Sequence, residues 1–154
     1  MEFLKSFNLA EFTTWKVGGD ADWAVLPESV EQIREACAWA RSQKLPVTVL
    51  GGGSNALVSD RGIEGLVILT KNFSKIEAPQ ISGNQLQVVC EAGAPKAELL
   101  KVFVKQRMSP AIFLAGLPGD VAGGVVMNAG VGHDVAPKEF CEIVDWVEWI
   151  DTSS

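Results

Sequence analysis

The first half of the chain alternates between short apolar runs and one helical pattern of apolar residues. The run Ala21–Leu26 ends at a proline and predicts a strand. Apolar residues then recur every three or four positions, which predicts a helix with one buried face. Ser29 begins this helix, because Gln32 follows three residues later and the two form a capping box. We expect the helix to end near Lys44, shortly before the next proline.

Short apolar runs predict three more strands. These are Val47–Leu50, Leu66–Leu69 and Leu86–Glu91. After Pro95, which suits the first position of a helix, an amphipathic stripe predicts a second helix to about Arg107. Alternation of apolar and polar residues over Ile143–Ile150 predicts a last strand. Strands and helices thus alternate along the chain, without an internal repeat or a low-complexity tract.

The composition narrows the classes of function that the chain can serve. Its 154 residues correspond to about one domain, and 47% apolar with 21% charged residues is ordinary for a globular protein. A net charge of −6 without a basic run argues against nucleic acid or an anionic membrane as a partner. No run approaches the ~18 apolar residues of a membrane span. Met1–Ala10 lacks the apolar core of a signal peptide, so we expect a cytoplasmic location.

The three cysteines, Cys37, Cys90 and Cys141, lie far apart in the sequence. Such a sparse and odd number suits a reducing compartment. No second cysteine or histidine lies near any of them at metal-ligand spacing, so we expect no metal site. Free cysteines usually behave as small core residues, and we expect these three to be buried thiols.

The strongest local signal is the glycine-rich stretch that follows the second predicted strand. Gly51, Gly52 and Gly53 permit positive φ angles and a close approach to the backbone. Their N–H groups, with the Ser54 hydroxyl and the Asn55 amide, form a possible cradle for a phosphate. A tight turn without a ligand is an equally good interpretation.

The same stretch matches a dinucleotide-binding fingerprint only superficially. The residues Gly51-x-Gly53-x-x-Ala56 fit the spacing G-x-G-x-x-G/A, but that motif needs a helix that begins at the loop. Too few residues follow before Gly62 to form one. Lys71 also stands where an acidic residue would bind the ribose. We therefore expect any nucleotide to be held by a loop between strands.

A second glycine-rich segment spans Ala111–Gly132 and carries almost no charge. Two adjacent glycines in a short apolar helix, Gly123 and Gly124, cost about 1 kcal/mol each relative to alanine, so we expect a compensating role. Close approach of the backbone to a flat, bulky ligand is one explanation, and tight packing of the helix is the other. Asn128 offers both a hydrogen-bond donor and an acceptor in apolar surroundings.

Four motifs occur along the chain: Thr13–Gly19, Gly51–Gly62, Glu91–Ala94 and Gly116–Gly130. In this order they resemble the N-terminal, FAD-binding part of the UDP-N-acetylenolpyruvoylglucosamine reductase family, also called UDP-N-acetylmuramate dehydrogenases. The resemblance implies an α+β, PCMH-type (vanillyl-alcohol-oxidase-type) fold with FAD between two small subdomains. These would span about 1–70 and 71–154, the second incomplete at its C-terminal end, and the substrate-binding domain would be absent.

The resemblance also implies which residues hold the cofactor. The loop residues Gly51, Gly52, Gly53, Ser54 and Asn55 would cradle the FAD pyrophosphate. The flavin side would be lined by Gly116, Pro118, Gly119, Gly123, Gly124 and Asn128. Family members follow Asn-Ala-Gly with an aromatic residue or His and then Gly. This chain has Val131 and Gly132 before His133, so the role of His133 stays open.

The family's reaction implies the remaining partners. Its members use NADPH, through the flavin, to reduce UDP-N-acetylglucosamine enolpyruvate to UDP-N-acetylmuramate for peptidoglycan. The family's catalytic Arg, Ser and Glu and its UDP-sugar site would lie beyond Ser154, so we expect this chain alone to be inactive. Two alternatives stay open: a non-catalytic flavin- or nucleotide-binding module or remnant, and a fragment of a related FAD-dependent oxidase.

Overall fold

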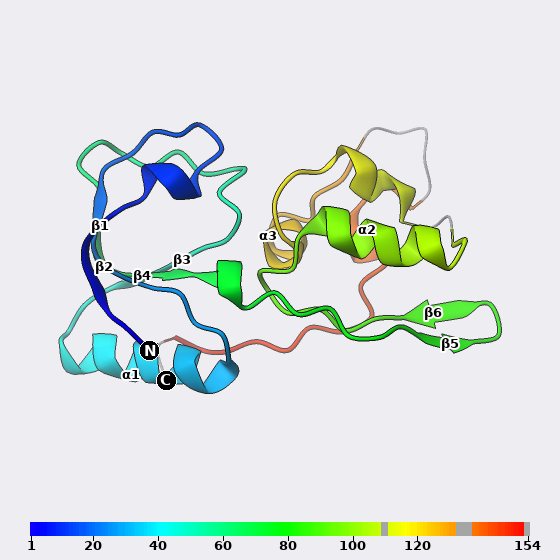
Figure 1. Cartoon of the computed structure of the whole chain (residues 1–154), viewed down its shortest axis with the longest axis horizontal. Coiled ribbons are helices and arrows are strands. Elements are labelled where there is room, and N and C mark those ends of the chain that lie inside the picture. The colour runs from blue at the N-terminus through cyan, green and yellow to red at the C-terminus, as the bar shows by residue number, and fades with distance from the viewer. Residues whose placement is uncertain (109–110, 132–136, 153–154) are drawn as a thin grey trace. The chain divides into compact units, whose positions relative to one another are not determined.

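The computed structural model describes residues 1–108, 111–131 and 137–152, and it divides into two compact units (Figure 1). Unit 1 is Met1–Phe73 together with the C-terminal residues from Glu148 on, and unit 2 is Ser74–Val147. Each unit has a hydrophobic core of its own. That the two units are the subdomains of one cofactor-binding domain stays a prediction.

Unit 1 is built on a four-stranded sheet with the order β1-β2-β4-β3. Strand β1, Leu4–Asn8, runs antiparallel to β2, Asp20–Val25. Strand β4, Ile63–Leu69, is parallel to β2 and to β3, Val47–Leu50. Helix α1, Val30–Ser42, connects β2 to β3. The three strands predicted before residue 70 are thus confirmed, with small shifts at their ends.

Strand β4 carries the core of unit 1 because both of its faces are buried. Alternate residues of a strand point to opposite faces. Val67 and Leu69 therefore join one hydrophobic cluster, and Leu66 and Ile68 join another. Helix α1 lies along the sheet of unit 1 (Figure 1), and three of its small residues are buried in the second cluster. These are Ala36, Cys37 and Ala40.

The start of α1 follows the predicted cap with one difference. Ser29 Oγ accepts a hydrogen bond from Gln32 N at 3.3 Å. Gln32 Oε1 accepts from Glu28 N at 2.8 Å, so the returning bond reaches one residue further back than in a capping box. The helix ends at Ser42, two residues before the predicted end.

Unit 2 consists of a short hairpin, two helices and 3₁₀ turns around one core. Strands β5, Gln80–Ser82, and β6, Gln85–Gln87, pair antiparallel. The helices are α2, Lys96–Lys105, and α3, Val121–Val126. The core is formed by Leu99, Ala111, Phe113, Leu114 and Phe140. None of the helices in the described ranges is long and apolar enough to cross a membrane.

The 3₁₀ turns of the whole chain are short. They are Ala10–Phe12, Thr70–Asn72, Ile112–Gly116 and Phe140–Glu142. Ala10–Phe12 directly precedes the Thr13–Gly19 motif, and Ile112–Gly116 lies in the second glycine-rich segment, before α3.

The strand predicted at Ile143–Ile150 is not formed. No described residue pairs with this segment in a ladder, and Asp145–Trp149 is exposed. A strand needs the N–H and C=O groups of a neighbour, and alternation in the sequence does not supply them. The prediction for this segment is therefore wrong.

Two further predictions in unit 2 need correction. The strand expected over Leu86–Glu91 ends at Gln87, and pairing resumes only as a single bridge between Ile76 and Cys90. Pro95 precedes α2 as its N-cap and is not its first helical residue, because its ψ of 132° is extended. The predicted helix itself is confirmed.

Candidate functional site

The glycine-rich loop follows β3, and unit 1 itself fixes its shape. Of the three glycines, Gly53 is the one with a positive φ, +63°. Thr14 N donates a hydrogen bond to Gly53 O at 3.2 Å. A Cβ on Gly53 would collide with Phe12 O and lie 2.9 Å from Thr13 Cα. Contact with the protein's own backbone therefore requires glycine at this position, independently of any ligand.

The other four loop residues are the ones that can meet a ligand. Gly52 and Asn55 are exposed, and Gly51 and Ser54 are partly exposed. Their polar groups are backbone N–H groups, a hydroxyl and a carboxamide, and no acidic residue follows before Asp60. Neutral donors gathered on a glycine-rich turn suit phosphate oxygens. The residues present thus fit the pyrophosphate of a dinucleotide.

No helix follows the loop, as predicted. Residues 51–62 run irregularly to β4, so no helix N-terminus lies there, and rejection of the dinucleotide fingerprint is confirmed. The segment interlocks with the Thr13–Gly19 motif instead. Gly19 N donates to Ser59 O at 2.9 Å, and a Cβ on Gly18 would lie 2.7 Å from Val58 Cβ.

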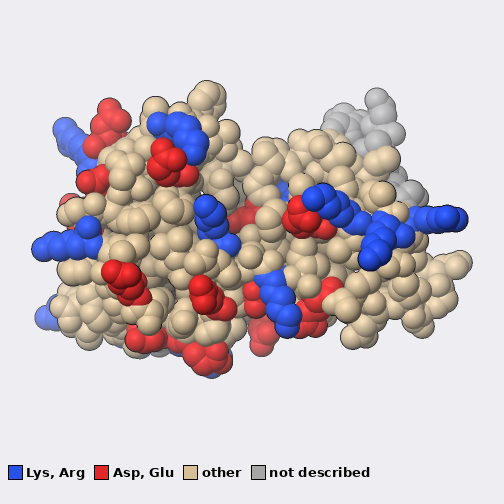
Figure 2. Space-filling model, in the orientation of Figure 1, with Lys and Arg blue, Asp and Glu red and all other residues tan. Residues whose placement is uncertain are grey.

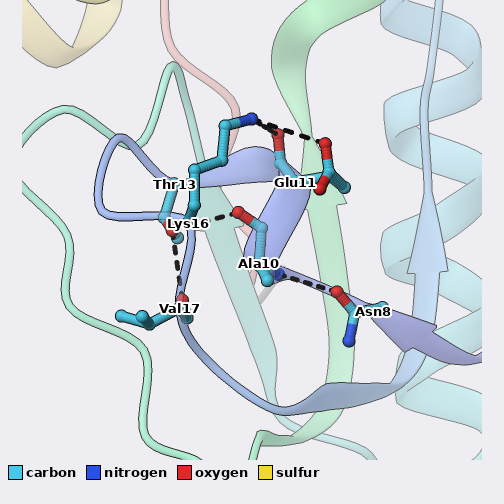
Figure 3. Close-up of polar contacts among 6 residues, drawn as sticks. All are labelled: Asn8, Ala10, Glu11, Thr13, Lys16 and Val17. Atoms are coloured by element: carbon cyan, nitrogen blue, oxygen red, sulfur yellow. Dashed lines mark hydrogen bonds and ion pairs between the residues drawn. The ribbon is translucent and has the colours of Figure 1, made fainter.

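The turn that holds Gly53 through Thr14 is anchored by Thr13, whose hydroxyl points to the carbonyls of Ala10 and Val17 (Figure 3). Thr13 is 3% exposed, and its hydroxyl lies 3.2 Å from Ala10 O and 3.1 Å from Val17 O. Lys16 and Glu11 form an ion pair at 3.4 Å on the outer side of the same turn. Both of these side chains are largely exposed, so the buried hydroxyl stabilises the turn more than the ion pair does.

Lys71 brings a positive charge next to Phe12. Lys71 Nζ is 5.5 Å from the centre of the Phe12 ring, and the Phe12 carbonyl faces Gly53. Figure 2 shows acidic and basic side chains interspersed over much of the visible face, with a group of basic side chains over the region of α2 in unit 2. Lys71 therefore places a positive charge next to Phe12, the residue whose carbonyl faces Gly53 of the loop.

The second glycine-rich segment forms α3 and the turns around it in unit 2. Asp120 Oδ1 caps α3 by accepting a hydrogen bond from Gly123 N at 2.8 Å, and Gly123 is exposed. Gly124 is buried. A Cβ on Gly124 would lie 2.6 Å from Phe140 Cζ and 2.8 Å from Lys96 Cε. Tight packing inside unit 2 therefore accounts for Gly124 without a ligand.

The other predicted residues of this segment lie at or near the surface of unit 2. Gly116, Pro118 and Asn128 are exposed, and Gly119 is partly exposed. Asn128 Oδ1 accepts a hydrogen bond from Cys141 N at 2.9 Å, so this acceptor serves the fold. The structure thus groups these residues around α3, whereas the glycine-rich loop belongs to unit 1.

Sequence reasoning missed two buried charged residues in unit 2. Lys96 is 4% exposed and Asp120 is 5% exposed. Lys96 Nζ donates a hydrogen bond to Pro118 O at 2.7 Å. Burial lowers the pKa of Lys96, and the negative charge of Asp120 opposes this shift. The burial of Lys96 could have been inferred from the apolar stripe, because Leu99 and Phe103 follow it by three and seven positions on the same helix face.

The three thiols differ in their surroundings. Cys37 is buried, and burial raises the pKa of the half-buried Cys90 thiol to about 11. Cys141 is exposed in a surface 3₁₀ turn, so the prediction of a buried thiol is wrong there. His133 lies outside the described residues. Within the described ranges, no group of three or more His, Cys, Asp or Glu residues could hold a metal ion.

Comparison with known proteins gives a consistent result. A family model described as an FAD binding domain matches residues 21–154. A UDP-N-acetylenolpyruvoylglucosamine reductase from Synechococcus sp. (strain WH7803) is 40% identical over 122 residues, which is 79% of this chain and 38% of that protein. The reductase of Prochlorococcus marinus (strain NATL2A) is 33% identical over 154 residues, covering 97% of this chain and 48% of that protein. The chain therefore spans less than half the length of these curated relatives.

Solved structures agree with this match. The crystal structure of UDP-N-acetylenolpyruvylglucosamine reductase from Thermus caldophilus aligns with a TM-score of 0.56 and 31% identity, over 84% of this chain and 42% of that one. A solvent-stable cholesterol oxidase aligns with a TM-score of 0.53 over 68% of this chain and 20% of that one, and at 21% identity it shows the fold alone. The α+β, PCMH-type fold and the resemblance to the N-terminal FAD-binding part of the reductases are thus confirmed.

Proposed function

Because the chain belongs to the family of FAD binding domains, we propose that it is the flavin-binding part of an NADPH-dependent UDP-N-acetylenolpyruvoylglucosamine reductase. The proposed reaction converts UDP-N-acetylglucosamine enolpyruvate to UDP-N-acetylmuramate in peptidoglycan biosynthesis, in the cytoplasm. The observation that carries the proposal is 33% identity to such a reductase over 97% of this chain.

In unit 1, the glycine-rich loop would hold the pyrophosphate of FAD. The contacts would come from Gly51, Gly52, Ser54 and Asn55, whose surfaces are exposed or partly exposed. Gly53 would contribute indirectly, because its positive φ and its contact with Phe12 shape the loop. The absence of acidic residues from the loop supports this role, since a carboxylate would repel the phosphates.

In unit 2, the residues around α3 would form the flavin side of the site. The direct contacts would come from Gly116, Pro118, Gly119, Gly123 and Asn128. Gly124 would contribute indirectly, because the lack of a side chain lets α3 pack closely against Phe140 and Lys96. Small residues at a surface favour close approach of a flat ring to the backbone.

When bound, FAD supplies hydride transfer between NADPH and the enolpyruvyl group. The part of this chain is to bind and orient the cofactor and to keep acidic groups away from its phosphates. Groups that bind the UDP-sugar and donate a proton would come from the part of the relatives that the chain does not match. We therefore propose that the chain by itself does not complete the reaction.

Substitution of Asn55 tests the cofactor site. Asn55→Asp places a negative charge on the exposed side chain of the loop, with little change in shape. We expect the parent chain to bind FAD in a flavin fluorescence titration and to melt at a higher temperature with FAD present. The variant should bind FAD at least about tenfold more weakly, because like charges repel, and should keep the parent's melting temperature without FAD.

Asn84→Asp is the matched control. Asn84 is exposed in the turn between β5 and β6, so the same change of charge is made away from the loop, and FAD binding should stay unchanged. Equal FAD affinity of the Asn55 variant and the parent would reject the loop assignment. A parent chain that neither binds FAD nor is stabilised by it would reject the proposed function and favour a remnant without a ligand.

A further inference from the structure

Lys96 is buried, and lysine is rarely buried without partners. It is the first residue of α2 and is 4% exposed. Its Nζ donates to Pro118 O at 2.7 Å and lies 5.8 Å from the centre of the Phe140 ring. Asp120 is buried nearby, and its charge acts on Lys96. Unit 2 thus encloses a positive charge, a negative charge and a backbone carbonyl.

The backbone around this cluster is fixed from both sides. Lys96 N donates to Gly119 O at 3.1 Å, and Val121 N donates to Ala94 O at 2.8 Å. These bonds tie the start of α2 to the start of α3, with the Pro118–Gly119 peptide between them. Packing alone does not call for charges here, since buried ion pairs can often be replaced by apolar side chains at little cost in stability.

The bond from Lys96 sets the orientation of the peptide that joins Pro118 to Gly119. In a planar trans peptide, the C=O and N–H groups point in opposite directions. Pro118 O points to the buried Nζ of Lys96, so the Gly119 N–H points away from it. This N–H makes no hydrogen bond to any described residue. The cluster therefore presents an oriented backbone donor on a partly exposed residue.

We propose that Lys96 is a positioning residue that acts through Pro118 and aims the N–H of Gly119 at an acceptor atom of the flavin ring. The inference rests on the proposed function, which puts Pro118 and Gly119 on the flavin side. Lys96 needs no contact with the flavin for this role. Asp120 balances its charge and caps α3 at the same time.

The double variant K96M/D120N separates positioning from stability. Methionine matches lysine up to Cε but lacks the charged Nζ, and asparagine is as good an N-cap as aspartate, so neither charge is left unpaired. We expect the variant to melt like the parent without FAD but to bind FAD about tenfold more weakly in a fluorescence titration. With saturating FAD, its visible flavin spectrum should shift from that of the parent complex toward that of free FAD.

Lys101→Met is the matched control, because Lys101 is an exposed lysine of the same helix. Its FAD affinity and spectrum should equal those of the parent. Lys96→Arg keeps a charged donor and should retain more FAD affinity than K96M/D120N.

Three outcomes decide the inference. A double variant that binds FAD with the parent's affinity and spectrum would overturn the role of Lys96 while leaving the proposed function intact. An unfolded double variant would overturn it too, because the pair would then be a requirement of the fold. Failure of the parent chain itself to bind FAD would instead overturn the proposed function on which the inference rests.

Discussion

Replacing Gly124 by alanine tests whether packing or a ligand demands glycine at this position of α3. The new Cβ would lie 2.6 Å from Phe140 Cζ and 2.8 Å from Lys96 Cε. Phe140 is 1% exposed and meets Phe113 edge to face at 5.7 Å. Because the ring is enclosed on its other sides, it cannot move aside without disturbing the core of unit 2.

The expected loss of stability follows from two opposing terms. Overpacking of a core costs about 1–3 kcal/mol, and alanine in place of glycine recovers up to about 1 kcal/mol in a helix interior. The recovery is at its low end here, because α3 has six residues. We expect a net destabilisation of about 1–2 kcal/mol, which for a chain of this size lowers the melting temperature by about 2–8 °C.

Thermal unfolding without added FAD measures this effect. Gly123→Ala is the matched control in the same helix, because Gly123 is exposed and a Cβ there would approach a side-chain atom, Asp120 Oδ1, at 2.7 Å. Its melting temperature should fall by less than that of Gly124→Ala, because Asp120 Oδ1 alone lies within 3 Å of the new Cβ, whereas Gly124 faces both the Phe140 ring and Lys96. A Gly124→Ala protein that melts like the parent, or higher, would refute the packing argument. Loss of FAD binding with an unchanged melting temperature would indicate that Gly124 lines the flavin directly.

Two further predictions concern the loop and the reaction. Gly53→Ala should destabilise the chain whether or not FAD is present, because the new Cβ would collide with Phe12 O and because a φ of +63° is unfavourable for alanine. A melting temperature equal to the parent's would contradict this. The 154-residue chain with FAD bound should not consume NADPH in response to the UDP-sugar, because the proton donor would come from the part of the relatives that the chain does not match. A positioned general acid alone contributes about 10²–10⁴-fold to a rate. Steady, UDP-sugar-dependent oxidation of NADPH would show that the active site has been misplaced.

The fold of unit 1 could be predicted from sequence where the signals are local. Ser29 marks the start of α1, and short apolar runs mark β2, β3 and β4, whereas β1 was not predicted. The segment Ile143–Ile150 shows the limit of such signals. Its alternating pattern is typical of a strand, but the hydrogen bonds of a strand come from a neighbour, and none of the described strands provides one.

The candidate site could be predicted only in part, because a sequence shows where glycine is needed but not what fills the space beside it. The resemblance assigns Gly53 and Gly124 to the cofactor, and this stays a prediction; the structure shows that Phe12 and Phe140 occupy the space beside their Cα atoms. Lys96 presents the opposite case, since a lysine at the start of a helix suggests an exposed side chain. Only its place on the apolar stripe, three residues before Leu99, indicated that the side chain is buried. Motif matching finds residues that contact a ligand more readily than residues that orient them, because the latter act through the backbone of others.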